Sequence, residues 1–216
     1  MFVSIHKRDI RYCADHVAEL LEKMPTAQDL EKVFAKLDDV AGKISTGGCT
    51  AIVAVVKNGH LCVANAGDAR AVLIRKVCFC LFSSWFFPLR FLPCQGKATR
   101  ISVDHRTTLA SERDRIRKDG GFILSGRVSG IIEVTRALGD ALIPLCIALP
   151  TVRDLAIEQG DVLVMGCDGV FDELSDDMVA NIVSRRPDPM QAALMLRDEA
   201  FYLGSTDNIS AACIKL

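Results

Sequence analysis

The sequence predicts a single α+β domain in which strands and helices are grouped into layers. Two helical stretches precede any strand, a hairpin with more strands follows, and two helices come shortly before a final strand. This order lacks the regular strand–helix alternation of βαβ units. Because 216 residues suffice for one well-buried core, we expect residues 1–216 to form one domain.

Two amphipathic helices are expected first, both on one outer face of the domain. Between Arg11 and Lys23 apolar residues recur at helical spacing, and the stretch ends before Met24-Pro25. The second helix is expected from Thr26 to Ala41, because Thr26 with Asp29 forms a capping box. Its apolar face consists of Leu30, Val33, Phe34, Leu37 and Val40.

The next segment predicts a β-hairpin at the centre of the sheet system. Two apolar, β-branched runs, Thr50–Lys57 and His60–Ala66, flank Asn58-Gly59, a strong signal for a two-residue turn. Further strands are expected at Ala71–Arg75, Arg100–Val103, Phe122–Leu124 and Asp161–Gly166. The long apolar runs indicate strands that are buried on both faces.

Two later helices have clear ends in the sequence. The charged stretch Ser111–Lys118 is followed by Gly120-Gly121, where a left-handed residue ends a helix at little cost. Asp188-Pro189, with Gln191, caps a helix expected to run to about Tyr202, and Gly204 stops it.

Composition excludes several classes of protein. Lys and Arg number 26 against 27 Asp and Glu, so the balance does not indicate a nucleic-acid partner or a polybasic membrane surface. The 9 cysteines are scattered without a CxxC pair, which favours reduced thiols over a disulfide framework or zinc site. The charged first residues do not resemble a secretory signal. We therefore expect a cytoplasmic or nuclear protein.

One segment, Val77–Gln95, does not fit the rest of the chain. It is rich in Phe, Cys and Leu, but Pro88, Arg90 and Pro93 interrupt it, so no membrane association is expected. Excision would leave AVLIRKGKATRISVDH, an uninterrupted strand, tight turn and strand. The first codon of the segment encodes Val and therefore begins with GT, and its last codon encodes Gln and can be CAG. These are the borders of an intron. Our hypothesis is a retained intron, which would form a protruding excursion with Trp85 and Phe86 outside the main core.

Four acidic motifs stand where strands meet loops. Taken alone, each is a common turn or cap signal. Together they predict a site for Mg²⁺ or Mn²⁺, because a buried carboxylate needs a partner and these cations prefer carboxylate oxygens. The spacing Asp168-x-x-x-Asp172 after an apolar strand is the most informative. The motifs are Ala66-Gly67-Asp68-Ala69-Arg70, Arg136-Ala137-Leu138-Gly139-Asp140, Cys167-Asp168-Gly169-Val170-Phe171-Asp172 and Gly204-Ser205-Thr206-Asp207-Asn208.

These motifs belong to a series that resembles the metal-dependent serine/threonine protein phosphatases of the 2C type. The series covers about Ser45 to Leu216, apart from the anomalous segment, and contains STGGCTAIVAVV, VANAGDARAVL, SVDHRT, the Glu112–Gly121 stretch, GRV, VTRALGD, DVLVMGCDGVFDELS and GSTDNIS. The resemblance implies a four-layer α-β-β-α sandwich of two antiparallel sheets flanked by helices. It also implies two or more Mg²⁺ or Mn²⁺ ions and hydrolysis of phosphoserine or phosphothreonine by metal-activated water.

The resemblance also implies roles for particular residues. Asp168 and Asp207 resemble ligands of one metal ion of the pair, and Asp68 resembles the carboxylate that holds a third ion beside Asp168, with Asp172 adjacent. Arg136, Asp140 and Asn208 correspond to residues that brace loops. The implied partners are phosphorylated protein substrates, and we expect a monomer.

The start of the chain departs from the family pattern. Where the family has Asp-Gly-His-Gly-Gly, this chain has Ser4-Ile5-His6-Lys7-Arg8, and only His6 aligns, as a candidate general acid. Asp9 is out of register with the metal-bridging Asp. We therefore expect an N-terminally incomplete phosphatase that binds Mn²⁺ weakly and turns over slowly. The alternative is a non-catalytic pseudophosphatase that acts as a binding module, and an upstream exon encoding the missing motifs would favour the enzyme.

Overall fold

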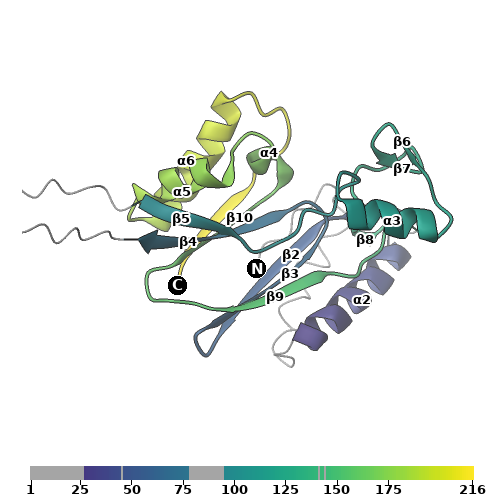
Figure 1. Ribbon diagram of the computed structural model, residues 1–216, viewed down its shortest axis with the longest axis horizontal. Coiled ribbons are helices and arrows are strands. Elements are labelled where there is room, and N and C mark those ends of the chain that lie inside the picture. The colour runs from purple at the N-terminus through teal and green to yellow at the C-terminus, as the bar shows by residue number, and fades with distance from the viewer. Residues whose placement is uncertain (1–26, 45, 78–94, 141, 144) are drawn as a thin grey trace, which may run out of the picture.

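The computed structural model describes residues 27–44, 46–77, 95–140, 142–143 and 145–216. Within these residues the chain forms two antiparallel sheets that pack face to face, with helices on the outer side of each (Figure 1). The expected α+β fold with an α-β-β-α layer order is therefore confirmed. None of the described helices is long and apolar enough to cross a lipid bilayer.

Each sheet is built from antiparallel neighbours. The first has the order β2-β3-β9 and the second the order β11-β10-β4-β5. Their strands are β2 (Ala51–Lys57), β3 (His60–Ala66), β9 (Thr151–Ala156), β4 (Arg70–Val77), β5 (Gln95–Arg100), β10 (Val162–Gly166) and β11 (Ala211–Lys215). Two short pairs lie beside them, β1 (Gly48–Cys49) with β8 (Leu138–Gly139) and β6 (Ile123–Leu124) with β7 (Arg127–Val128).

The alternation of side chains along each strand explains the layers. On β3, Ala64 and Ala66 face the helix α2 (Ala27–Ile44), whereas Leu61 and Val63 face the second sheet. On β4 and β10 the same alternation places one set of side chains in the core between the two sheets. The other set packs against the helices on the outer face of the second sheet. Because side chains alternate with a period of two, apolar runs such as Val162–Gly166 can serve two cores at once.

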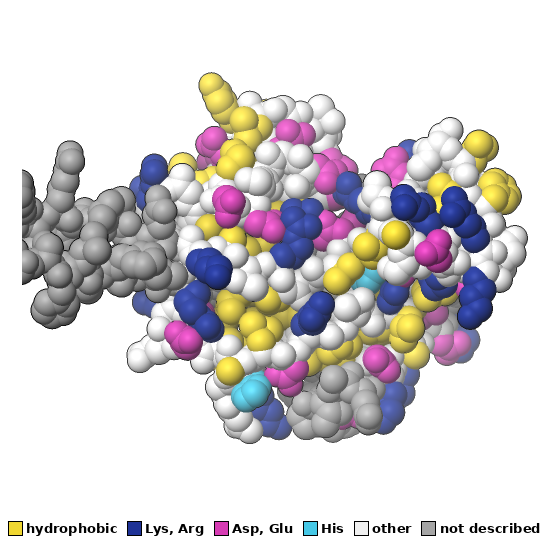
Figure 2. Space-filling model, in the orientation of Figure 1, with side chains coloured by type: hydrophobic (Ala, Val, Ile, Leu, Met, Phe, Trp, Pro, Cys, Tyr) yellow, Lys and Arg dark blue, Asp and Glu magenta, His cyan; other side chains and the backbone are white. Residues whose placement is uncertain are grey.

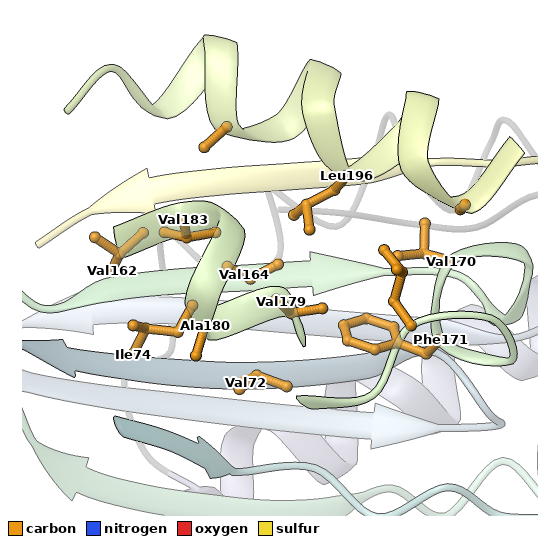
Figure 3. Close-up of a cluster of buried hydrophobic side chains, with 13 residues drawn as sticks. Val72, Ile74, Val162, Val164, Val170, Phe171, Val179, Ala180, Val183 and Leu196 are labelled. Atoms are coloured by element: carbon orange, nitrogen blue, oxygen red, sulfur yellow. The ribbon is translucent and has the colours of Figure 1, made fainter. Parts of the chain in front are cut away.

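The helices on the far side of the second sheet are α4 (Asp168–Phe171), α5 (Asp176–Ser184) and α6 (Pro189–Tyr202). Figure 3 shows their apolar side chains packed on Val72, Ile74 and Val164 of the sheet. The side chain of Asp188 caps α6 by accepting a hydrogen bond from the backbone N–H of Met190, as predicted. The remaining helix, α3 (Ala110–Lys118), matches the expected one and ends before Gly120, whose φ is +80°.

The hairpin is confirmed, but only β3 is central in its sheet, because β2 lies at the edge of the order β2-β3-β9. Asn58 and Gly59 have φ of 51° and 76°, the left-handed pair that a two-residue turn requires. On the outer face, α2 covers the first sheet with Leu30, Val33, Phe34 and Leu37. The other expected helix, from Arg11 to Lys23, and its neighbour Thr26 lie outside the described residues.

One strand was placed wrongly. The sequence predicted Arg100–Val103, but β5 ends at Arg100. The physical reason is a change of partner: the backbone N–H of Ala71 donates to the hydroxyl of Ser102, at 2.8 Å, in place of a backbone carbonyl. The chain leaves the sheet there and enters the loop that carries Asp104, His105 and Arg106.

The strands on either side of the anomalous segment pair directly with one another. In the register of β4 and β5, Lys76 lies opposite Gly96 and Val77 lies opposite Gln95. Residues 78–94, including Trp85 and Phe86, lie outside the described residues. The intron hypothesis therefore stays a prediction, although the register agrees with a hairpin that closes at Lys76 and Gly96.

Candidate functional site

The predicted aspartates gather at one end of the two sheets. Asp68 follows β3, Asp168 begins α4 directly after β10, and Asp207 lies in the loop before β11. These three carboxylates line a cavity of about 320 Å³, whose wall also includes Gly48, Cys49, Arg127 and Glu133. Asp172 caps the C-terminal end of α4. The structure thus places the three side chains from distant parts of the sequence around one opening.

Asp168 and Asp207 are brought together by close packing of two loops. A Cβ atom on Gly169 would lie 2.4 Å from the backbone oxygen of Asn208, so only glycine permits this approach. The hydroxyl of Ser205 donates to the carbonyl of Gly169 at 2.8 Å, and the thiol of Cys167 donates to the carbonyl of Asn208 at 2.9 Å. The Asp-Gly pair is therefore more than a turn signal, because its glycine lets the two acidic loops touch.

Asp68 is positioned by a buried histidine. His105 is fully buried, its backbone N–H donates to the carbonyl of Gly67 at 2.9 Å, and its Nε2 lies 2.8 Å from the hydroxyl of Thr151. Burial, with a contribution from the nearby Arg136 charge, lowers the pKa of His105 to about 4, so the ring is neutral at physiological pH. A neutral ring can occupy this core position without the cost of a buried charge.

Arg106 pairs with the carboxylates of the site. Its Nε donates to Asp68 Oδ2 at 2.9 Å, while Nη1 and Nη2 each lie 3.0 Å from an oxygen of Asp172. Nη2 is also 3.8 Å from Asp168 Oδ2. We call Asp68, Asp168 and Asp172 the acidic cluster. One guanidinium therefore faces three carboxylates.

Burial raises the pKa values of two carboxylates of the acidic cluster, although the charge of Arg106 opposes the rise. Burial raises the pKa of Asp68 to about 6, and the Asp168 charge adds to the rise while Arg106 opposes it. Burial, followed by the charge of Asp207, raises the pKa of Asp168 as well. Carboxylates that are desolvated and close to one another favour an added cation. Their oxygens are the ligands that Mg²⁺ and Mn²⁺ prefer, so the donor chemistry of these side chains suits such an ion.

A second network, the Asp104 network, holds the loop of Arg106 to the second sheet. Arg70 pairs with Asp104, and its Nη1 also donates to Asp176 at 3.1 Å. Arg100 donates to the same Asp176 at 2.8 Å. The guanidinium carbon of Arg70 lies 4.9 Å from the ring centre of Phe171, on α4 between Asp168 and Asp172. The network thereby links α4 to the loop that carries Arg106.

A third ion-pair group, the Glu112 cluster, stabilises the segment on the other side of the cavity. Arg136 donates to both oxygens of Glu112, at 2.6 and 3.2 Å, and Arg115 donates to Glu112 Oε2 at 3.1 Å. Burial opposes ionisation of Glu112, but these partners hold its pKa at about 2. Arg136 thus makes an ion pair with the buried Glu112.

The outcome for the predicted residues is mixed. Asp68, Asp168 and Asp207 share the cavity, whereas His6 lies outside the described residues. Across the described part of the chain, no three His, Cys, Asp or Glu side chains stand close enough together to hold a metal ion. Arg106 was not among the predicted site residues. Its only signal in the sequence is a cation near Asp104 within the SVDHRT motif.

Comparison with known proteins identifies the family. The family model described as Protein phosphatase 2C matches residues 6–209. This chain belongs to the protein phosphatase 2C family. Among relatives of this 2C-type chain, probable protein phosphatase 2C 13 of Arabidopsis thaliana is 34% identical over 213 residues, which cover 91% of this chain and 50% of the relative. Protein phosphatase 2C homolog 1 of Schizosaccharomyces pombe is 31% identical over 95% of this chain and 59% of its own length.

Solved structures share the fold of this 2C-type domain. A phosphatase from a pathogenic strain of Toxoplasma gondii superposes with a TM-score of 0.73 and 22% identity, covering 94% of this chain and 79% of that one. A sex determining protein of C. elegans gives a TM-score of 0.73 at 20% identity, covering 94% of this chain and 50% of that one. The chain spans about half the length of the Arabidopsis relative.

Proposed function

We propose that this chain is a serine/threonine protein phosphatase domain, whose substrates are proteins carrying phosphoserine or phosphothreonine. The observation that carries the proposal is the convergence of Asp68, Asp168 and Asp207 on one cavity. Membership of the protein phosphatase 2C family supports the same class of reaction. We infer that Asp168 and Asp207 would hold one Mg²⁺ or Mn²⁺ ion, and that Asp68 with Asp168 and Asp172 would hold another.

The side chains of the site have separate tasks in this proposal. When bound, the divalent ions would activate water and neutralise charge on the phosphoryl oxygens. Asp168 would be shared between the two groups of ligands, because its carboxylate interacts electrostatically with both Asp207 and Asp68. Arg127 reaches the cavity wall, where it pairs with Glu133 and donates to the carbonyl of Ile131 at 2.9 Å. It supplies the cavity wall with a cation that a phosphorylated substrate would meet.

The charge over the surface is consistent with a protein substrate. Asp and Glu side chains alternate with Lys and Arg over the face that Figure 2 shows, without a broad patch of one sign. Such a surface does not favour nucleic acid, whose binding depends on clustered basic residues. On this face, recognition of a phosphoprotein would therefore depend on the cavity and its rim rather than on a broad charged surface.

The experiment is a phosphatase assay on the full chain with a phosphothreonine peptide, with and without Mn²⁺. We expect Mn²⁺-dependent release of phosphate that is lost in Asp168→Asn. Absence of turnover, together with phosphopeptide binding that survives Asp168→Asn, would overturn the enzyme proposal in favour of a binding module. Absence of both would exclude either function for this chain.

A further inference from the structure

Arg106 occupies carboxylate oxygens that a divalent ion would use. Its Nε is paired with Asp68 Oδ2 and its two terminal nitrogens are paired with Asp172. The fork of the guanidinium thus joins the end of β3 to the end of α4. A divalent ion that takes the same oxygens would compete with the guanidinium, because two cations at the same oxygens repel each other.

The backbone of Arg106 is fixed, so displacement concerns its side chain alone. The backbone N–H of Arg106 donates to the carbonyl of Asp104 at 3.0 Å, and its carbonyl accepts from the N–H of Leu109 at 3.0 Å. The backbone of Arg106 also forms an isolated antiparallel β-bridge with that of Val134. The side chain remains 28% exposed, which leaves it a route into solvent.

We propose that Arg106 is a built-in cation that competes with divalent ions for Asp68 and Asp172 and so sets the metal concentration at which the acidic cluster fills. The proposal rests on the metal site proposed above. Without metal, the guanidinium holds the two carboxylates together and limits their repulsion. With metal, it gives up both partners and turns toward solvent. Arg106 is accordingly a positioning residue that acts through the carboxylates it releases.

Three variants of the full chain test this inference by Mn²⁺ titration calorimetry. Arg106→Gln removes the charge and should bind Mn²⁺ roughly ten-fold more tightly, because no charge-assisted pair has to be broken. Arg106→Lys keeps the charge but loses the fork, so its affinity should lie between the two. The matched control is Arg75→Gln, which loses an arginine paired with Asp161 and Glu158, outside both the acidic cluster and the Asp104 network, and should bind Mn²⁺ like the unchanged chain.

Thermal unfolding gives an independent readout. Without metal, Arg106→Gln should melt at a lower temperature than the unchanged chain, because Asp68 and Asp172 lose their common partner. The upward shift on addition of saturating Mn²⁺ should be larger in this variant. A role confined to holding loops together would instead lower both melting temperatures equally.

The outcomes separate this inference from the proposed function. Equal or weaker Mn²⁺ binding by Arg106→Gln, in a chain whose binding is lost in Asp168→Asn, overturns the competition and leaves the metal site standing. If Arg106→Gln does not fold, unchanged or weaker binding by Arg106→Lys overturns it in the same way. Absence of Mn²⁺ binding in the unchanged chain and every variant overturns both.

Discussion

The acidic cluster and the Glu112 cluster are built from the same groups in opposite proportions. In the first, one guanidinium faces three carboxylates; in the second, Arg115 and Arg136 face the single carboxylate of Glu112. Burial raises the pKa of Asp68 to about 6, whereas the pKa of Glu112 falls to about 2 because its arginine partners outweigh burial. Both carboxylates are buried. Two arginine partners can thus offset the burial of one carboxylate, whereas one arginine shared among three carboxylates does not.

The largest expected effect breaks the acidic cluster. Asp168→Asn should reduce Mn²⁺-dependent hydrolysis more than about 100-fold, because the variant loses a shared charged ligand. Folding should change little, since the Asn oxygen can still accept the backbone N–H of Gly169. Circular dichroism checks the fold and a phosphopeptide assay checks the rate. The control is Asp198→Asn on α6, an exposed carboxylate that pairs with Arg197, and a similar loss there would contradict the assignment.

Next in size is a change in the Glu112 cluster. Glu112→Gln should lower the free energy of unfolding by about 3 kcal/mol at pH 7, because two half-buried guanidinium groups lose their charged, buried partner. The folded pKa of about 2 is below the ordinary value of 4.5, so the stabilisation is complete above pH 4.5 and is lost as pH falls toward 2. Urea unfolding at several pH values measures it. A difference from the unchanged chain that persists at pH 2 would contradict this origin, and Mn²⁺ affinity should be unaffected.

The Asp104 network provides an intermediate case, since two arginines and two aspartates balance there. Arg70→Lys should cost about 2 kcal/mol of unfolding free energy, because lysine cannot span Asp104 and Asp176 or stack on Phe171 in the same way. Mn²⁺ affinity should fall by less than in Asp168→Asn. Urea unfolding measures the loss of stability and Mn²⁺ titration calorimetry measures the affinity. A complete loss of metal binding would show that the network belongs to the site itself.

The smallest effect is expected from a change outside all three groups. Deleting Val77–Gln95 joins Lys76 to Gly96, which are cross-strand partners, and Arg75 and Lys97 then close a two-residue turn. The melting temperature and the Mn²⁺ affinity of the deleted chain should both stay close to those of the full chain. A large loss of stability would show that the segment is part of the fold and would oppose its interpretation as a retained intron.

Elements with a strong apolar pattern were predicted well from the sequence. An exposed edge strand and a strand end that depends on a tertiary contact were not. The hairpin at Asn58-Gly59 and the strand before Asp168 were predictable, because a run of apolar residues and a turn pair carry their own signal. Strand β9 was not predicted: its sequence TVRDLA has exposed polar residues on an edge strand, so burial did not mark it. The end of β5 at Arg100 depends on the hydroxyl of Ser102, which is a tertiary contact.

The same limit applies to the site. Aspartates after apolar strands could be recognised one by one, and three of them share the cavity as expected. The part played by Arg106 depends on distances between side chains that are far apart in sequence. It follows only from the packing of the loop after β5 against α4.

The pairing of β4 with β10 has a consequence for how the site is assembled during folding. Arg70 lies opposite Gly166, so the strands that carry Asp68 and Asp168 at their ends meet only when residues about a hundred positions apart have found each other. Contacts of such long range slow folding, because the entropy of closing a long loop is lost before the contacts can compensate for it. The first sheet's hairpin can form early, but the carboxylates that line the cavity come together only with this late pairing. We therefore expect metal ions to bind after the slow step of refolding rather than to nucleate it.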